Sequence, residues 1–288
     1  MDPSHASAEP TAGRSARLPG DPPEGPDDTL LAAVTEVWTY RELLRVIAVR
    51  DLLVRYKQSL VGAGWALFVP LANMAVFTVL FTRVVRMETE LPYPIFVYAG
   101  LLPWTWFASA LSVATSSLTQ NMGLVTRVYF PREILPLSAV LVTMVDFLLG
   151  GVVLGVLMVL YGVVPGPEVL LLPLVVGVQL AFTVGLGLLM ATGNLFFRDV
   201  RYLMTVLVGI WMFLTPVLYP LEKVGGRLET VLRWNPMAPV IESYRWLLLG
   251  SAPPATGPAI FSVASSLVLL AGGWLLFHRL EPRFAEVI

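Results

Sequence analysis

The sequence contains no cysteine, so it can form neither disulfides nor thiolate metal sites. It has two histidines, His5 and His278, which argues against a multi-histidine metal site or a Ser-His relay. Its two lysines are Lys57 and Lys223, and neither follows a glycine. Because a P-loop needs Gly-Lys-Ser/Thr, we expect no ATP hydrolysis in this chain. We also expect no other catalytic activity, no bound metal and no cofactor.

Charge is scarce as well. Only 14% of the 288 residues are charged, against about 25% in soluble domains. Hydrophobic residues make up 56% of the chain, and the mean hydropathy is +0.75. This composition predicts an all-α polytopic membrane protein that occupies residues 36–288. Residues 1–35, rich in proline and acid, are predicted to be a disordered cytoplasmic tail and show no signal-peptide pattern.

Residues from Thr39 to Ser59 alternate arginines with aliphatic side chains. At 100° per residue, most of the aliphatic side chains fall on one side and most of the charges on the other, although Arg50 lies in the apolar sector. We expect an amphipathic helix on the membrane surface whose arginines reach toward lipid phosphates.

Six apolar runs follow, each long enough to cross a hydrocarbon layer about 30 Å thick. We expect all six to be helices because lipid offers the backbone no hydrogen-bond partners. They are Leu60 to Thr82, Ile95 to Leu118, Ile134 to Val163, Val169 to Phe196, Tyr202 to Leu218, and Gly257 to Phe277. With the N-terminus inside, 13 of the 19 arginines and lysines lie in cytoplasmic segments. This positive-inside bias predicts that both termini are cytoplasmic.

The segment from Tyr219 to Gly250 joins the fifth and sixth runs on the external side. Leu228 to Trp234 and Pro239 to Leu249 are predicted to be short helices separated by Asn235-Pro236. Their aromatic and leucine content favours a re-entrant hairpin over a plain external loop.

The connector from Asn121 to Pro136 carries charges that cannot lie in lipid. We expect a short helix that begins near Gly123 and stops before Pro131. Tyr129 and Phe130 lie between arginines, and we expect them to be exposed anchors for a partner protein. The alternative is a solvated turn.

Asp146 is the one ionisable side chain deep in a predicted span. It could serve a proton relay. However, the runs offer it no second intramembrane charge, so a structural carboxyl that hydrogen-bonds neighbouring helices is the preferred interpretation. The 31 aromatic residues include membrane-interface anchors, and some could stack on sugar rings along an export path.

Several short motifs occur in an order that resembles the ABC-2 type permeases. The most similar branch exports lipid-linked polysaccharides such as O-antigen and teichoic acid. The motifs are Arg50-Asp51-Leu52, Arg55-Tyr56-Lys57, Gly62-Ala63-Gly64-Trp65, Val128-Tyr129-Phe130-Pro131-Arg132, Phe197-Arg198-Asp199-Val200-Arg201, Thr215-Pro216-Val217, Tyr219-Pro220 and Asn235-Pro236.

The resemblance implies a multi-pass homodimer in a bacterial inner or plasma membrane, with two separate ATP-binding subunits on the cytoplasmic side. The substrate would be a lipid-linked glycan, and membrane lipids but no nucleic acid would be partners. The implied ATPase-coupling residues are Arg127, Val128, Tyr129, Phe130, Pro131 and Arg132, with Arg198, Asp199 and Arg201 in a second contact. The implied interface-helix residues are Arg50, Asp51, Arg55, Tyr56 and Lys57. Candidates for the glycan path are Trp65, Phe68, Phe77, Trp211 and Phe213.

Two alternatives remain open at this point. An ABC-2 exporter of a drug or small lipophilic molecule would share the fold. A proton-coupled secondary transporter would rest on Asp146 alone.

Overall fold

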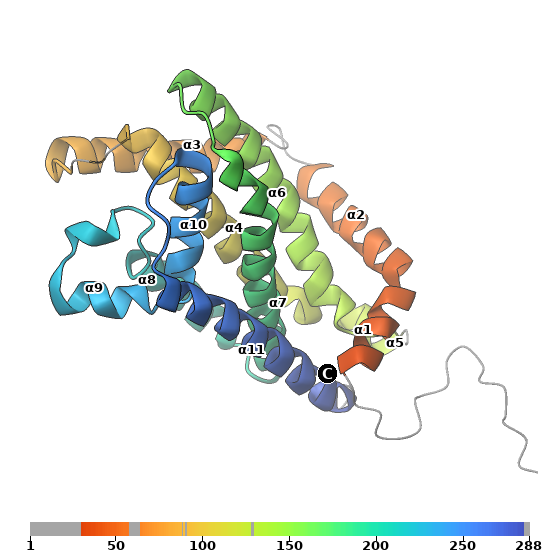
Figure 1. Ribbon diagram of the computed structural model, residues 1–288. Coiled ribbons are helices and arrows are strands. Elements are labelled where there is room, and N and C mark those ends of the chain that lie inside the picture. The colour runs from red at the N-terminus through yellow and green to blue at the C-terminus, as the bar shows by residue number, and fades with distance from the viewer. Residues whose placement is uncertain (1–29, 58–63, 88, 90, 128–129, 285–288) are drawn as a thin grey trace, which may run out of the picture.

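A computed structural model describes residues 30–57, 64–87, 89, 91–127 and 130–284. Every regular element in these ranges is a helix (Figure 1). The all-helical prediction is therefore confirmed for the part of the chain that the structure describes. The first 29 residues, which make up most of the predicted tail, lie outside it.

Five helical segments are long and apolar enough to cross a membrane. The first is α3 (Gly64–Val79), continued by the π-helical turn η1 (Leu80–Val84). The others are α4 (Tyr93–Gln120), α6 (Ile134–Leu160), α7 (Leu172–Phe196) preceded by η2 (Pro167–Leu171), and α11 (Thr256–Leu280). These correspond to five of the six predicted apolar runs.

The remaining run, Tyr202 to Leu218, forms the shorter helix α8 (Val200–Phe213). At 1.5 Å per residue its 14 residues extend about 21 Å, less than the hydrocarbon layer. The chain leaves the helix at Leu214 and enters a turn that contains Pro216. The helical part of this run is thus shorter than the sequence predicted.

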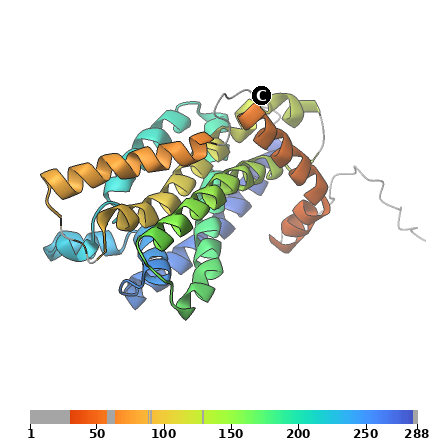
Figure 2. The same ribbon diagram turned by 90° about the horizontal axis from the view of Figure 1, so that it is seen from above.

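Two helices precede the first span. Helix α2 (Arg41–Lys57) covers most of the segment predicted to be a surface helix, and it packs against α6. Its Ile47 is buried, whereas Leu53 and Val54 remain exposed on a face free to meet lipid. Helix α1 (Leu30–Thr39) shows that residues 30–35, assigned to the disordered tail, are helical. Figure 2 shows α1 and α2 at one side of the bundle, crossing the direction of α6.

Helix α4 lies at the centre of the bundle, with most of its side chains buried among α3, α6, α7, α8 and α10. Helices α7 and α11 pack closely together, and two glycines permit it. A Cβ on Gly273 would lie 2.4 Å from the carbonyl oxygen of Gly185, and one on Gly185 would lie 2.4 Å from the carbonyl carbon of Leu269. Small residues at helix crossings are a common packing device in membranes.

Between α8 and α11 lie η3 (Leu221–Lys223), α9 (Gly226–Arg233) and α10 (Met237–Leu249). The predicted pair of short helices is therefore confirmed, with its break at the Asn235-Pro236 step. Helix α10 packs against α4 and ends at Gly250, whose positive φ of 72° reverses the chain. The short connector helix α5 (Met122–Arg127) and the final turn η4 (Glu281–Arg283) lie at the opposite end, near α1 (Figure 1).

Candidate functional site

A cavity of about 770 Å³ lies between the end of α2 and helices α3, α4, α6 and α8. Helix α4 supplies its floor and α8 one wall. The predicted interface helix contributes Arg55 and Tyr56, and α8 contributes Arg201 and Tyr202. The cavity thus joins segments that are far apart in sequence, and two arginines stand on its lining.

A row of hydroxyl groups runs along the face of α4 that lines the cavity. Its members are Thr105, Ser109, Ser112 and Ser116, spaced by four, three and four residues. This spacing keeps them on one helical face. Thr105 donates to the Leu102 carbonyl at 3.0 Å, and Ser116 donates to the Ser112 carbonyl at 3.3 Å. With these protons used locally, the oxygens remain available as acceptors for a polar ligand.

Aromatic side chains form the apolar part of the lining. Trp65 from α3 and Trp104 and Trp106 from α4 border the cavity. Trp104 is nearly fully buried and contacts the rings of Phe107 and Trp211 behind it. The exposed indole of Trp65 and the row of hydroxyls are groups that stack on and hydrogen-bond to a sugar ring.

Asp146 is held on the cavity wall by two residues of α2. Its Oδ2 lies 2.9 Å from Nη2 of Arg55, and its Oδ1 accepts a short hydrogen bond from the Tyr56 hydroxyl. Partial burial, together with this hydrogen bond, raises the pKa of Tyr56 to about 12. The phenol therefore stays protonated and keeps donating. Asp146 is hydrogen-bonded, as the sequence interpretation expected, and its charged partner Arg55 comes from α2, outside the apolar runs.

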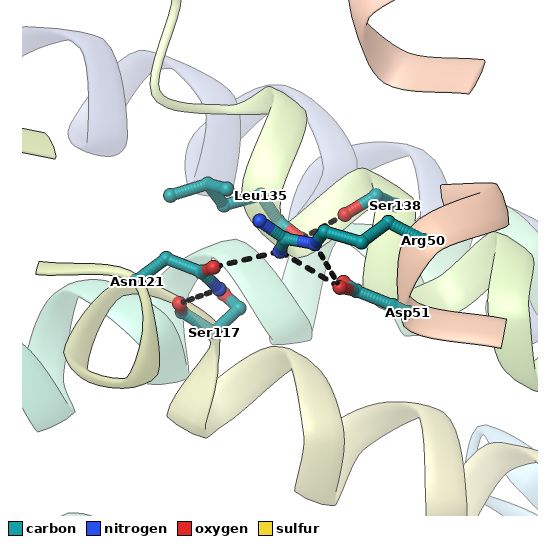
Figure 3. A network of polar contacts seen from close by, with 6 residues as sticks. All are labelled: Arg50, Asp51, Ser117, Asn121, Leu135 and Ser138. Carbon is teal, nitrogen blue, oxygen red and sulfur yellow. Dashed lines mark hydrogen bonds and ion pairs between the residues drawn. The ribbon is translucent and has the colours of Figure 1, made fainter. Parts of the chain in front are cut away.

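The interface helix also contacts the start of the connector (Figure 3). Arg50 donates from Nη2 to the side-chain oxygen of Asn121 at 2.8 Å and from Nε to Asp51 at 2.9 Å. Asn121 in turn donates to the Ser117 carbonyl at 2.9 Å. Because Asn121 is the residue between α4 and α5, Arg50 links the surface helix directly to the connector. In the sequence pattern Arg50 is an irregularity, because it lies in the apolar sector of the helix. Its contact with Asn121 explains that position.

The connector itself matches the prediction in outline. Helix α5 begins at Met122 and ends at Arg127, well before Pro131. Arg127 is exposed, and Arg132 is half-buried and donates to the carbonyl of Glu281 at 2.7 Å. Val128 and Tyr129 lie outside the described residues.

Phe130 differs from the expectation of an exposed anchor. Only 4% of its surface is accessible, and it lies in a cluster with Ile47, Ile134 and Phe284. Pro131 is buried beside it. The reason is that the chain turns inward here to start α6, which directs the ring into the packed end of the bundle. Phe130 therefore fixes the connector to its own chain.

The second predicted contact follows α7. Phe197 is 71% exposed, and Arg198, Asp199 and Arg201 are exposed beside it. Arg201 also stacks over the Tyr202 ring at 4.6 Å and donates to its hydroxyl at 2.5 Å. Phe197 thus has the exposure that was expected of Phe130.

The five candidates for a glycan path do not gather at one place. Among them, only Trp65 lines the cavity. Phe68 and Phe213 are exposed on the outer faces of α3 and α8. Phe77 and Trp211 are partly buried against the core around α4. Sequence reasoning missed the hydroxyl row of α4, although its spacing was visible in the sequence.

The half-buried Asn235 and the buried Arg245 fix the turn after α8. Asn235 accepts a hydrogen bond from Trp211 at 3.0 Å and donates to the Leu214 carbonyl at 2.9 Å. Arg245 was counted as an external charge, yet it is only 4% exposed. It donates to the carbonyls of Pro216 and Val217, both at 2.6 Å, and its guanidinium lies 3.7 Å from the centre of the Phe96 ring. Burial lowers the pKa of Arg245 to about 9.

Comparison with known proteins shows the family to which the chain belongs. The model of the family described as "ABC-2 type transporter" matches residues 42–249. Over 261 residues the chain is 35% identical to the O-antigen export system permease protein RfbA of Myxococcus xanthus, covering 90% of this chain and 100% of that protein. It is 32% identical to an RfbA of Klebsiella pneumoniae, covering 86% of this chain and 95% of the relative. The polysialic acid transport protein KpsM of Escherichia coli is 21% identical over 208 residues. The chain belongs to the ABC-2 type transporter family.

Proposed function

We propose that this chain is the membrane-spanning permease subunit of an ATP-driven exporter that moves a lipid-linked polysaccharide such as O-antigen out of the cytoplasm. The observation that carries the proposal is the 35% identity over the whole length of an O-antigen export permease. ATP hydrolysis belongs to a separate subunit, because neither lysine of this chain can complete a P-loop.

The cavity supports a glycan as the substrate class. Its row of hydroxyls and its tryptophans suit a polyhydroxylated chain better than a small lipophilic drug, which needs few hydrogen-bond partners. Arg55 and Arg201 stand on the same lining. Guanidinium groups bind phosphate oxygens through paired hydrogen bonds, so these arginines suit the phosphate link of a lipid carrier.

In the membrane, α8 with the turn as far as Leu218 forms the sixth crossing, and both termini lie in the cytoplasm. Helices α9 and α10 form a re-entrant hairpin in the outer leaflet. The exposed apolar faces of α3 and α8, which include Phe68 and Phe213, meet a second copy of the chain in a homodimer. The cavity beside these helices then opens toward the dimer interface, where the polymer passes.

On the cytoplasmic side, two segments receive the force of the ATP-binding subunits. These are the connector around Arg127 and the loop from Phe197 to Arg201. Arg50 couples the first of these to the surface helix through Asn121. A push on the connector therefore reaches α2 and, through Arg55 and Asp146, the cavity wall.

The hydroxyl row provides the test. A variant with Thr105, Ser109, Ser112 and Ser116 changed to alanine should still insert and bind its ATPase, yet should display less polysaccharide on the cell surface while lipid-linked polymer accumulates inside. The control replaces Ser138 and Thr192, which are buried elsewhere and hydrogen-bonded to backbone carbonyls. Unchanged surface polysaccharide in the four-residue variant would refute the assignment of the cavity to the glycan.

A further inference from the structure

A buried carboxylate and two titratable side chains meet at the end of the bundle opposite the external hairpin. Glu133, directly before α6, is 1% exposed. Its Oε1 lies 3.3 Å from Nδ1 of His278 near the end of α11. The same Nδ1 lies 3.7 Å from Oε2 of Glu281. One potential ligand atom from each of the three residues lies within 4.8 Å of the others.

The second oxygen of Glu133 provides an independent sign of a missing ligand. Oε2 is buried and has no hydrogen-bond partner among the described residues. A buried carboxylate oxygen without a partner costs free energy, so native structures rarely leave one. Oε2 of Glu133 therefore lacks the hydrogen bond or ligand that a buried carboxylate oxygen normally has.

The charges around this point are mostly negative. Glu36 of α1 is close enough to Glu133 to interact with its charge, so a third carboxyl lies near this point. Against these three carboxylates stands Arg132, whose main-chain N–H donates to Oε1 of Glu281 at 3.2 Å. This bond orients Glu281 and leaves its Oε2 facing His278. A cation at the centre would balance the excess of negative charge.

The residue types and their geometry suit a transition-metal ion. Imidazole and carboxylate are ordinary zinc ligands, with bonds of about 2.0–2.2 Å that place two ligand atoms of a tetrahedral site roughly 3.4 Å apart. His278 and Glu281 are three residues apart on the last helical turns, so they present ligands on one face. Glu133 completes the set from a different part of the chain.

We propose that Glu133, His278 and Glu281 form a binding site for one divalent transition-metal ion of the zinc class. The ion links Glu133, the residue directly after Arg132, to the C-terminal end of α11. It thereby fixes the connector against the bundle. This site is distinct from the cavity and does not depend on which substrate the protein moves.

The test is a titration of the detergent-solubilised full-length chain, without an affinity tag, with Co²⁺ as a spectroscopic probe. We expect visible absorption bands that saturate at one Co²⁺ per chain and disappear when Zn²⁺ is added. Glu133→Gln and His278→Asn should each weaken Co²⁺ binding by about tenfold or more, since loss of a residue that only hydrogen-bonds a ligand already costs about that much. Zn²⁺ should raise the Tm of the wild type and not of these variants.

His5→Gln is the matched control, since it removes the other histidine of the chain and should leave binding unchanged. Glu281→Gln provides a third ligand variant in case another fails to fold, and each variant is first checked for a monodisperse elution profile. Absence of Co²⁺ bands in the wild type, or equal affinity in folded ligand variants, would overturn the proposal. Either result would leave the proposed export function untouched.

Discussion

Arg55 and Asp146 form an ion pair, with Nη2 of the arginine 2.9 Å from Oδ2 of the aspartate, that fixes the end of the surface helix to the middle of α6. The pair explains how a carboxylate is tolerated in a long apolar helix. The arginine comes from α2, which precedes the first span, so the charge does not have to be neutralised by residues within the spans. The environment of Asp146 consequently depends on the position of α2 as well as on the surrounding spans.

We expect Asp146→Asn to leave export nearly intact and its pH dependence unchanged. Asparagine retains an acceptor for the Tyr56 hydroxyl, while a proton relay would need the ionisable group. The measurement is surface polysaccharide, or transport in vesicles, across a range of pH. Lost transport in a folded variant with normal ATPase coupling would instead assign a proton role to Asp146.

A double-mutant cycle with Arg55→Ala and Asp146→Ala should give a favourable coupling energy. Hydrogen bonds between charged groups contribute about 1.5–3 kcal/mol. Because Arg55 is 38% exposed, we expect the lower part of that range. Unfolding of the detergent-solubilised single and double variants measures it, and additive effects of the two substitutions would show that the pair contributes nothing.

We expect Arg245 to stabilise the fold through its buried hydrogen bonds and not to act as a surface charge. Arg245→Met keeps much of the volume but leaves the carbonyls of Phe96, Pro216 and Val217 without their donor. The loss of these charged hydrogen bonds should cost about 3 kcal/mol or more. The control is Arg227→Met, at an exposed position of α9. Equal Tm values for the two variants would contradict the assigned role of Arg245.

The two aromatic residues beside the coupling segments should behave differently. Phe130→Ala should lower stability by about 3–5 kcal/mol because it opens a cavity in a packed cluster. Phe197→Ala should leave Tm unchanged but weaken binding of the ATP-binding subunit, since its ring is exposed. Tyr161→Ala, at an exposed position beyond the other end of α6, is the control for the binding assay. Normal ATPase binding by Phe197→Ala would remove the second loop from the coupling surface.

Glu242 on α10 should make stability depend on pH. Burial raises its pKa to about 7, from an ordinary value of 4.5, although Arg233 opposes the shift. Because the folded state favours the protonated form, the stabilisation is complete below about pH 4.5 and is lost as the pH rises through about 7. The Tm of the wild type should therefore fall more than that of Glu242→Gln between pH 5 and pH 8. Parallel Tm curves would show that Glu242 titrates normally.

Much of the fold follows from local patterns in the sequence. Long apolar runs must be helical in lipid, and five of the six predicted runs are long apolar helices. The end of α8 was not predictable in this way, because Asn235, 21 residues later, provides the hydrogen bond to the Leu214 carbonyl where the helix stops. A pattern within the run contains no information on that contact.

The candidate site was less predictable than the fold. Phe130 is buried in a cluster that includes Phe284, and the charge of Asp146 is balanced by Arg55; the members of each set are far apart in sequence. The aromatic path candidates were chosen by residue type, which does not reveal the direction in which a ring points. The hydroxyl row of α4, by contrast, follows from helical spacing alone, because all of its members lie on one helix.

Transport in proteoliposomes tests the proposed function most directly. The vesicles contain this chain with its ATP-binding subunit, and a lipid-linked polysaccharide is supplied on the side of the ATPase. We predict that polymer appears on the opposite side only with ATP, and that the rate falls when the four hydroxyls of α4 are removed. A complex that hydrolyses ATP, but moves the polymer no faster than one whose ATPase lacks its P-loop lysine, would contradict the account.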